Sequence, residues 1–311
     1  LIPAYNEEEN VVQNIKSLLK MDYPNFEIIV VNDGSSDKTH EKIVEAFNLY
    51  QIESSQKVSI PTKEVRGVYY NVDYPNLLYI DKENGGKSDA LNAGINASSY
   101  PLFACLDADS RLEKDALLKL SIEFNKDKNT IVAGGIVRIA NGSVIRDGEF
   151  KGFSMPKRII ERFQIVEYYR SFLSGRVSWG ISNSMLIVSG AFGVFQKQAV
   201  IEVGGYKTST IGEDMEIVVR LHSYMRKHKR KYKIIFCEDA VCWTQGPMSL
   251  KDIRGQRRRW QIGLLDTLIS HKNLLFNPKY GTVGLVAVPY FWIFELSGAL
   301  IEVLGYFIIP F

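Results

Sequence analysis

The sequence predicts an α/β fold in which a mostly parallel sheet carries helices on both faces. Short β-branched runs alternate with helical patterns through the first half of the chain, and this strand–loop–helix order is typical of parallel sheets. Polar residues gather directly after each strand, at the edge where such folds bind ligands. The expected strands are 26–33, 77–81 and 101–109, and the helices that follow them are 35–50, 87–98 and 111–124.

Length, charge and cysteine count bound the possible functions. The 311 residues suffice for one large or two ordinary domains. With 38 Lys and Arg against 35 Asp and Glu, any basic function is local, and the composition argues against a nucleic-acid-binding protein. Three cysteines without metal-type spacing indicate reduced packing residues in a cytosolic compartment. The chain starts without methionine and ends in an apolar run, so we expect a fragment cut at both ends.

Two stretches depart from the strand–helix order. Residues 50–76 are expected to form a long connection containing proline and tyrosine, and connections of that length are usually functional or mobile. Residues 151–180 place apolar and aromatic residues at helical spacing between charges. That pattern fits a helix packed on the core or one lying on a membrane surface, and both interpretations stay open.

The last part of the chain is strongly apolar. Residues 283–311 are long enough to cross a hydrocarbon layer about 30 Å thick. Glu295 and Glu302 count against a transmembrane helix, although their spacing puts both on one helix face that could meet a neighbouring helix or a polar channel. A soluble core helix is the alternative. Just upstream, 264–279 is amphipathic and basic, which suits an interfacial helix on the cytoplasmic side.

Carboxylates follow several of the predicted strands. Asp107 and Asp109 flank a small alanine, and in strand-like geometry both would face one pocket. Hard oxygen ligands at that spacing suit Mg²⁺ or Mn²⁺ carrying a diphosphate. The alternative is a solvated turn in which Asp109 or Ser110 caps the next helix. Asp33 ends another strand and could accept hydrogen bonds from a base or ribose, although Asp-Gly is also common turn chemistry.

Two further motifs add a cation and a second acidic pair. Lys87 follows two glycines and precedes a helix, yet Asp81 stands where a phosphate-binding P-loop needs glycine, so an ATPase or GTPase is not supported. The position also suits a lysine that contacts a diphosphate from the start of a helix. Glu213 and Asp214 begin a helix, where the helix dipole alone could favour them. The same placement could aim a carboxylate at a hydroxyl proton, as a direct displacement requires.

Six motifs occur in order: PAYNEE, VNDGSSD, GGKSDALNAG, DAD, GED and QRRRW. Together they resemble the family 2 glycosyltransferases, and most closely the membrane-embedded processive branch that contains cellulose, hyaluronan, chitin and poly-N-acetylglucosamine synthases. The resemblance covers essentially the whole chain. It implies a Rossmann-like GT-A catalytic domain over 1–245, the QRRRW segment with amphipathic interfacial helices over 246–282, and a transmembrane segment over 283–311.

The resemblance also implies a UDP-sugar donor, a divalent metal and inversion at the anomeric carbon. Motif by motif, it implies that Ala4, Tyr5 and Glu7 line the nucleotide pocket and that Asp33 binds uracil. It also implies that Lys87 and Asp107 contact diphosphate and ribose, and that Asp109 with Asp107 holds Mg²⁺ or Mn²⁺. Asp214, beside Glu213, would be the general base. Gln256, Arg259 and Trp260 would serve the diphosphate and the acceptor.

The chemistry of QRRRW fits those roles. Arginine meets phosphate oxygens bidentately, and the indole offers an apolar platform for a sugar ring. Arg257 and Arg258 fill variable positions, where contact with anionic lipid stays open. A second basic run, 226–233, is interpreted as a solvated surface turn, with headgroup contact as the alternative.

The sequence therefore predicts a processive inverting β-glycosyltransferase that extends a polysaccharide from a UDP-sugar at the cytoplasmic face of the inner membrane. UDP-N-acetylglucosamine is the first choice of donor and UDP-glucose the second; the acceptor is the growing polysaccharide, and no nucleic acid partner is expected. Three alternatives stay open: a transferase that adds a single sugar to a lipid or glycan, a catalytically silent UDP-sugar-sensing or assembly subunit, and a transporter or channel.

Overall fold

The computed structural model describes residues 1–53, 58–146 and 149–308. Its first sheet has five strands: β1 (Ile2–Ala4), β2 (Ile28–Asp33), β3 (Tyr50–Ile52), β4 (Val65–Tyr70) and β5 (Leu77–Lys82). They lie in the order β1-β2-β5-β4-β3. β1, β2 and β5 run parallel, whereas β4 and β3 are antiparallel. The predicted long connection over 50–76 is thus wrong where β3 and β4 form; residues 54–57 lie outside the described part.

A second five-stranded sheet follows: β6 (Leu102–Leu106), β7 (Arg111–Leu112), β8 (Thr130–Ile139), β11 (Phe192–Gln196) and β12 (Lys233–Thr244). Its order is β6-β11-β8-β12-β7, and among these strands only β8 and β12 pair in parallel. The prediction of a mostly parallel sheet is wrong here. β11 returns between β6 and β8 in the opposite direction, and a local pattern carries no information about such a distant pairing.

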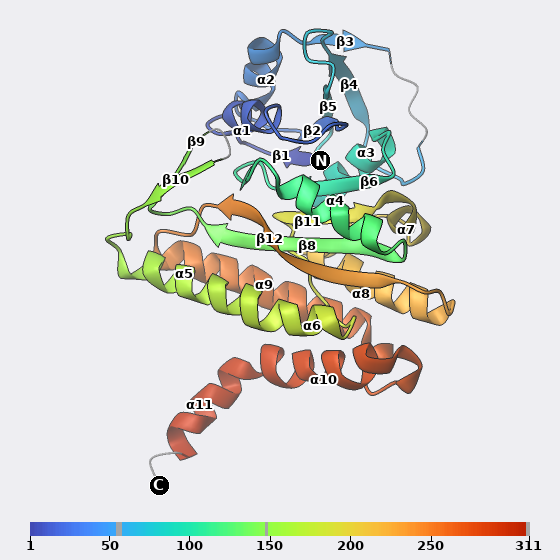
Figure 1. Cartoon of the computed structure of the whole chain (residues 1–311), viewed down its shortest axis with the longest axis vertical. Helices are drawn as coiled ribbons and strands as arrows, with labels where there is room; N and C mark the ends of the chain where they lie inside the picture. Colours follow the sequence, from blue (N-terminus) through green and yellow to red (C-terminus); the bar gives the residue numbers. More distant parts are fainter. Residues whose placement is uncertain (54–57, 147–148, 309–311) are drawn as a thin grey trace.

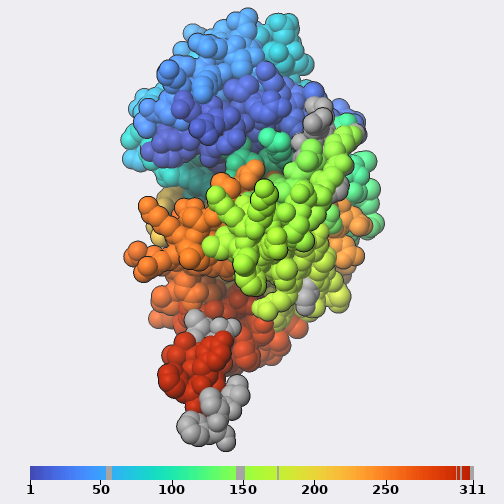
Figure 2. All heavy atoms as spheres, turned by 90° about the vertical axis from the view of Figure 1, so that its left-hand side faces the viewer, coloured from blue at the N-terminus to red at the C-terminus, as the bar shows by residue number. Residues whose placement is uncertain are grey.

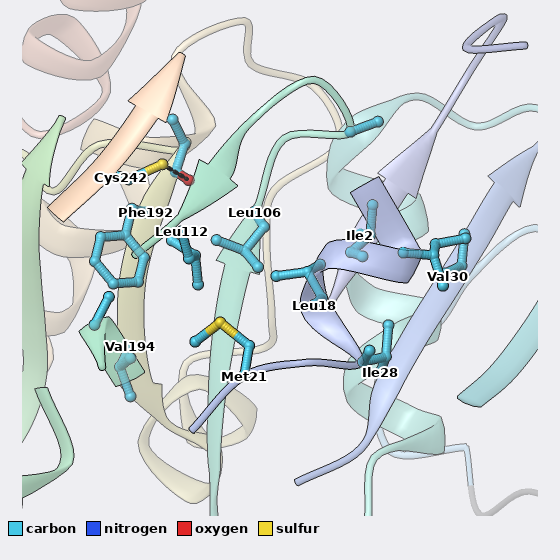
Figure 3. Packing of buried hydrophobic residues seen from close by; sticks show 14 of the residues in the cluster. Ile2, Leu18, Met21, Ile28, Val30, Leu106, Leu112, Phe192, Val194 and Cys242 are labelled. Atoms are coloured by element: carbon cyan, nitrogen blue, oxygen red, sulfur yellow. Dashed lines mark hydrogen bonds between the residues drawn. The ribbon is translucent and has the colours of Figure 1, made fainter. Parts of the chain in front are cut away.

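The two sheets meet through the first residue of the chain. The Leu1 nitrogen donates to the Ala104 carbonyl at 2.7 Å, and the Leu106 amide donates to the Leu1 carbonyl at 3.0 Å. β1 therefore lies beside β6. A shared core joins the sheets, with Ile2, Leu18 and Val30 on one side and Leu106, Phe192 and Cys242 on the other (Figure 3). This junction brings the carboxyl ends of β1, β2, β5 and β6 to one region.

Further helices pack around the two sheets: α1 (Val11–Leu18), α2 (Thr39–Phe47), α3 (Lys87–Ala97), α4 (Ala116–Lys126), α7 (Lys197–Glu202) and α8 (Glu213–Lys227). α8 illustrates why the sequence folds this way. Its first turn is acidic and its last turn is basic, which complements the helix dipole, and its apolar residues point into the core. The predicted helices after the three strands are confirmed.

A further layer lies beneath the second sheet (Figure 1). It holds α5 (Ile159–Arg170), which continues through a π-helical turn (Ser171–Arg176) into α6 (Val177–Ile181), and α9 (Leu250–Ser270), which Ser249 caps by accepting from the Asp252 amide. A hairpin of β9 (Ser143–Arg146) and β10 (Glu149–Phe153) precedes α5. The helix predicted within 151–180 is confirmed. One side of it packs on the core through Phe172, while Phe163 on the other is 68% exposed, so both interpretations stay open.

The chain then continues through short 3₁₀ turns (Lys272–Leu274, Pro278–Tyr280), a π-helical turn (Val283–Ala287), α10 (Val288–Tyr290), another π-helical turn (Phe291–Leu296) and α11 (Gly298–Ile308). Figure 2 shows the last part of this segment, α11, as a narrow projection at one end of the molecule. No helix among the described residues combines the length and apolarity needed to cross a membrane. The transmembrane segment predicted over 283–311 thus stays a prediction. Glu295 is exposed, and the Glu302 side chain lies outside the described part.

Candidate active site

The acidic motif after β6 sits in a tight turn. Ala108 is buried, and its carbonyl accepts a hydrogen bond of 2.8 Å from the buried Asn14 side chain of α1. Asp107 and Asp109, on either side, are partly exposed. The turn leads into β7, and α4 begins only at Ala116. The alternative in which this turn caps the next helix is therefore wrong.

Lys87 joins three of the predicted motifs. As the first residue of α3, it places its Nζ 2.6 Å from Oδ1 of Asp107 and 3.2 Å from Oε1 of Glu213. Burial would lower the pKa of Lys87, but the charges of Asp107 and Glu213 hold that pKa well above its usual range. The ammonium is therefore a fixed cation between the DAD turn and the start of α8.

The glycine loop before Lys87 is held by hydrogen bonds to the buried Asp33 carboxylate. The Asp33 carboxylate accepts from the amides of Gly85 (3.0 Å) and Gly86 (2.7 Å) and from Nζ of Lys82 (2.8 Å). Lys82 is fully buried and also pairs with Asp89 at 2.6 Å. Asp33 is 3% exposed, and three of the roughly four acceptor positions of a carboxylate are used. The structure thus places Asp33 beneath the loop rather than at its surface.

Asp214 lies against the segment that precedes β11. Its Oδ2 accepts from the Gly190 amide at 3.3 Å, and its Oδ1 accepts from the Met215 amide at 2.9 Å. Gly190 lies close to this group of charges, because a Cβ there would lie 3.1 Å from Nζ of Lys87 and 3.6 Å from Oε1 of Glu213. Gly190 therefore lets the cation and both acidic residues of α8 share one small space.

The site carries more negative charge than its lysine neutralises. Burial raises the pKa of Asp109, and the charge of Asp107 raises it further. Burial also raises the pKa of Glu7, together with the charges of Asp109 and Asp107. The pKa of Glu213 is raised by burial, which the charge of Lys87 only partly offsets. The three raised pKa values thus mark carboxyl groups whose ionised forms a nearby cation would stabilise.

The donor set suits a hard divalent cation. Within the described ranges, no three His, Cys, Asp or Glu side chains form a ready metal cluster. Mg²⁺ and Mn²⁺ sites that work on nucleotides need no such cluster, because one or two carboxylates suffice when substrate phosphates complete the shell. The carboxylates of Asp109 and Asp107 fit that arrangement, and the raised pKa of Asp109 marks charge that a cation would relieve.

The PAYNEE motif lies at the end of β1, next to the turn after β2. Ala4 pairs with Asn32 and is buried, while Tyr5 is 53% exposed. Asn6 has a left-handed backbone (φ 57°), and its Oδ1 accepts from the Ser36 amide at 2.8 Å. Tyr5 and Glu7 thus stand at the surface of a braced turn, close to the acidic motif after β6.

α9 carries QRRRW and packs against α8 through two glycines. A Cβ on Gly212, the cap of α8, would lie 2.8 Å from Cα of Gly263 on α9. His271 near the end of α9 also lies 3.2 Å from Glu216 on α8. The helix that bears the motif is therefore held at the start of the helix that bears Asp214.

The side chains of QRRRW point in different directions. Trp260 is 47% exposed, and the Arg257 guanidinium lies 4.9 Å from the centre of its ring while also pairing with Glu167 of α5. Arg259 is exposed, and Oε1 of Gln256 is buried without a hydrogen-bond partner. Among the described residues, Arg259 and Trp260 make no recorded contact with the carboxylates. The structure thus brings their helix to the site, but not their side chains onto the acidic set.

Sequence reasoning missed Lys82 and Arg176, whereas Gly190 lies in 189–195, a stretch whose small residues predict close approach on the acceptor side. Lys82 directly follows the predicted strand 77–81, and this adjacency was its only signal. Arg176 had none, because it lies in the helical stretch 151–180 among other charges. Burial lowers the pKa of Arg176 to about 10, and the charge of Asp214 partly offsets this effect.

A separate basic hollow of about 510 Å³ lies at the far end of α8. It is formed largely by the basic run 226–233, together with Lys279. Lys233 pairs with Asp127 at 2.8 Å and Arg230 pairs with Glu202. None of the predicted site residues lines it.

Two family profiles match the chain: "Glycosyl transferase family 2" over residues 1–179 and "Glycosyl transferase family group 2" over residues 102–310. Over 270 residues the chain is 30% identical to the poly-beta-1,6-N-acetyl-D-glucosamine synthase of Staphylococcus aureus (strain COL) and to the protein of that name from Staphylococcus epidermidis. Each match covers 86% of this chain and 55% of the relative. The chain thus spans about half the length of these curated relatives.

Solved structures share the fold. The mannosyltransferase PcManGT from Pyrobaculum calidifontis, in complex with GDP-Man and Mn²⁺, has a TM-score of 0.64 at 17% identity, covering 96% of this chain and 72% of that one. The 1–349 fragment of S. aureus TarS has a TM-score of 0.54 at 14% identity, covering 95% and 72%. The same fragment with UDP-GlcNAc has a TM-score of 0.52 at 14% identity, covering 96% and 74%. The GT-A-like α/β fold is confirmed.

Proposed function

The chain belongs to glycosyl transferase family 2, and on that premise we propose that it transfers a sugar from a UDP-sugar to the end of a growing polysaccharide, with inversion. One observation carries the proposal: the contact of Lys87 with both Asp107 and Glu213, beside Asp214. This contact joins the diphosphate-binding motifs to the acidic pair of α8. A transferase needs that juxtaposition, because the donor's leaving group and the acceptor's hydroxyl must meet at one carbon.

In the proposed reaction, Asp214 takes the proton of the acceptor hydroxyl. The hydroxyl oxygen then forms a bond to the anomeric carbon as the bond to the diphosphate oxygen breaks, and UDP leaves with the electron pair. Asp214 is held ready for this by the Gly190 and Met215 amides. Glu213 pairs with Lys87, so its part is to fix the cation rather than to take the proton.

The nucleotide would lie against Ala4, Tyr5 and Glu7, with Lys87 next to the diphosphate. Asp33 acts in this proposal through the glycine loop that it holds, because its carboxylate is already engaged by Gly85, Gly86 and Lys82. If Asp33 also bound uracil, as the family resemblance implies, the base N–H would compete with Gly85, Gly86 and Lys82 for the same carboxylate oxygens.

Asp109 with Asp107 would hold Mg²⁺ or Mn²⁺, which when bound supplies charge neutralisation to the diphosphate. Gln256, Arg259 and Trp260 would complete the acceptor and diphosphate side of the site from α9. Bound Mn²⁺ in PcManGT, a protein of the same fold, supports a divalent metal.

UDP-N-acetylglucosamine is the proposed donor, and UDP-glucose is the second choice. The name of the staphylococcal relatives and the UDP-GlcNAc complex of TarS support this order. We place the enzyme at the cytoplasmic face of the inner membrane as part of a multi-pass protein. Support comes from large apolar side chains exposed on the C-terminal segment, such as Phe294 (55%) and Phe307 (72%).

The test is UDP release by the protein in lipid vesicles with Mn²⁺, using Asp214→Asn. We expect turnover to fall by a factor of about a thousand or more while UDP binding, followed by calorimetry, stays within a few-fold of wild type. Asp239→Asn, which removes an exposed carboxylate far from the motifs, is the matched control and should keep full turnover. Wild-type turnover in Asp214→Asn would show that another group is the base.

Product mass decides between the two transferase alternatives. A distribution of long chains from one acceptor supports processive synthesis, whereas one added sugar per acceptor would show a single-addition enzyme. No metal-dependent UDP release with any donor would favour a silent sensing or assembly subunit.

A further inference from the structure

Positive charge dominates the basic hollow at the end of α8, and none of the described residues that line it is acidic. The hollow measures about 510 Å³ and lies where the turn after α6, the turn from α8 to β12 and the segment after α9 meet. Glu202 and Asp127 pair with two of its cations from outside. Within the described ranges, the other four cations take part in no ion pair. The six cations are Arg226, Lys229, Arg230, Lys231, Lys233 and Lys279.

The inner wall of the hollow is fixed by hydrogen bonds. Tyr232 is buried, and its hydroxyl accepts from Nε of Arg226 at 2.8 Å. The Tyr232 carbonyl accepts from the Asn183 side chain at 2.9 Å, and the Asn183 carbonyl accepts from Nη2 of Arg226 at 3.4 Å. One guanidinium is therefore held in place, while exposed lysines on flexible stems surround it. Cations that converge in this way suit an anion with several acceptor oxygens, such as a phosphate.

The apolar C-terminal segment begins at the wall of this hollow. α8 packs against the 3₁₀ turn Pro278–Tyr280, which carries one of the lysines, and both lie on the same side of the molecule (Figure 1). A Cβ on Gly281 would lie 2.5 Å from Nη1 of Arg226, so the chain passes directly against the guanidinium. In the next helical turn, Leu285 is 48% exposed and Val286 is 52% exposed. Unpaired cations and exposed apolar side chains are therefore neighbours.

This combination selects a phospholipid among the molecules that carry a phosphate. A phospholipid joins a phosphate to hydrocarbon chains, so it matches both the charge and the apolar side chains. Basic clusters next to an apolar segment bind anionic headgroups, and each Lys or Arg near the surface adds to the attraction. A free phosphate would match the charge alone and would leave the neighbouring apolar side chains exposed to water.

We propose that the basic hollow binds the phosphate of an anionic phospholipid headgroup, and that the acyl chains lie along the apolar side chains that follow Gly281. The inference rests on the membrane location proposed above. It does not involve the donor site, because none of the predicted site residues lines the hollow. The basic run 226–233 is then a headgroup contact rather than a solvated turn.

The test removes two charges that reach the hollow from different segments. The hollow variant combines Lys231→Gln with Lys279→Gln, two exposed lysines whose side chains make no hydrogen bond within the described part of the chain. Arg226 is kept because its guanidinium belongs to the fixed wall. The matched control combines Lys16→Gln with Lys38→Gln, two exposed lysines of α1 and of the cap of α2. A third variant, Lys231→Arg with Lys279→Arg, keeps the charge of the hollow.

Each protein is sedimented with vesicles of phosphatidylcholine alone and with vesicles that also contain phosphatidylglycerol. The readout is the ratio of the two partition coefficients, in which the contribution of the apolar segment cancels. We expect the hollow variant to lower this ratio by about ten- to thirty-fold, roughly the attraction that two lysines add at an anionic surface. The control and the arginine variant should keep the wild-type ratio, and added salt should lower it.

Three results would overturn the inference. An unchanged ratio in the hollow variant would exclude the lipid and point to an acidic protein surface as the occupant. An equal loss in the control would show that overall charge, rather than the hollow, attracts the lipid. Calorimetry with inorganic phosphate tests the soluble source of the same chemistry. Phosphate binding that the hollow variant loses, with its vesicle ratio unchanged, would assign the hollow to a free phosphate.

The same variants keep this inference apart from the proposed function. UDP binding with Mn²⁺ should be equal in wild type and the hollow variant, and a loss of it would overturn the inference, because the hollow would then act through the donor site. If wild type bound neither kind of vesicle, the membrane location would fail and the inference with it. If the vesicle ratios came out as expected but wild type bound no UDP, only the proposed donor would fail.

Discussion

The contact between Gly212 and Gly263 sets the distance between the helix with the proposed base and the helix with QRRRW. In Gly263→Ala, the new Cβ would lie 2.7 Å from Cα and 2.9 Å from the nitrogen of Gly212. Both are backbone atoms, so no side chain can rotate away. Ordinary contact begins at 3.4 Å, so α9 must move from α8 by about 0.7 Å at this point.

A displacement of that size is large for catalysis and moderate for stability. A misplacement of about 1 Å can lower a rate roughly a hundred-fold, so we expect kcat/KM to fall by about ten- to a hundred-fold. Overpacking of this kind usually costs about 1–3 kcal/mol, so the protein should still fold. The assay is UDP release in vesicles, with the melting temperature measured on the same preparation.

Gly255→Ala is the matched control, because it makes the same change on the same helix where no atom lies within 4 Å. It should keep wild-type activity and gain up to about 1 kcal/mol from the higher helix propensity of alanine. The reciprocal change Gly212→Ala, whose Cβ would meet Cα of Gly263 at 2.8 Å, should reproduce the loss. Wild-type kcat/KM in Gly263→Ala would refute the idea that this contact positions the motif.

Two further predictions concern the charges of the site. Lys87→Met leaves Asp107 and Glu213 without their cation and raises the pKa of Glu213 further. The melting temperature of Lys87→Met should therefore fall furthest below that of wild type at pH 8, and the difference should shrink as the pH falls to 5 and the carboxylates are protonated. An equal difference at pH 8 and pH 5 would contradict the pairing. Because burial and Asp107 raise the pKa of Asp109, the ionised form is disfavoured in the folded state, and the penalty is present above that pKa and relieved as the pH falls. Mn²⁺ should consequently raise the melting temperature more at pH 8 than at pH 5. The Asp109→Asn variant should lose this rise, and without metal it should be as stable as wild type. A metal-induced rise that persists in Asp109→Asn would place the ion elsewhere.

Part of the site was readable in the sequence because its signals are local. Asp107 and Asp109 directly follow a strand, Lys87 begins a helix after two glycines, and Glu213 and Asp214 start an amphipathic helix. The order of these motifs also predicted the family, which the matching profiles confirm. Such features depend on residues a few positions apart, so one chain is enough to reveal them.

The tertiary structure decided which of these groups meet. β11 pairs antiparallel with both β6 and β8, and this pairing brings Gly190 close to Lys87 and Asp214. The fold buried Asp33 under the glycine loop with Lys82, where the sequence predicted a contact with the nucleotide. It also buried Nε and Nη1 of Arg176 without hydrogen-bond partners among the described residues. Each outcome depends on contacts between distant segments, whose packing energy is not encoded in any local pattern, so the sequence determined the chemical groups and the fold determined their partners.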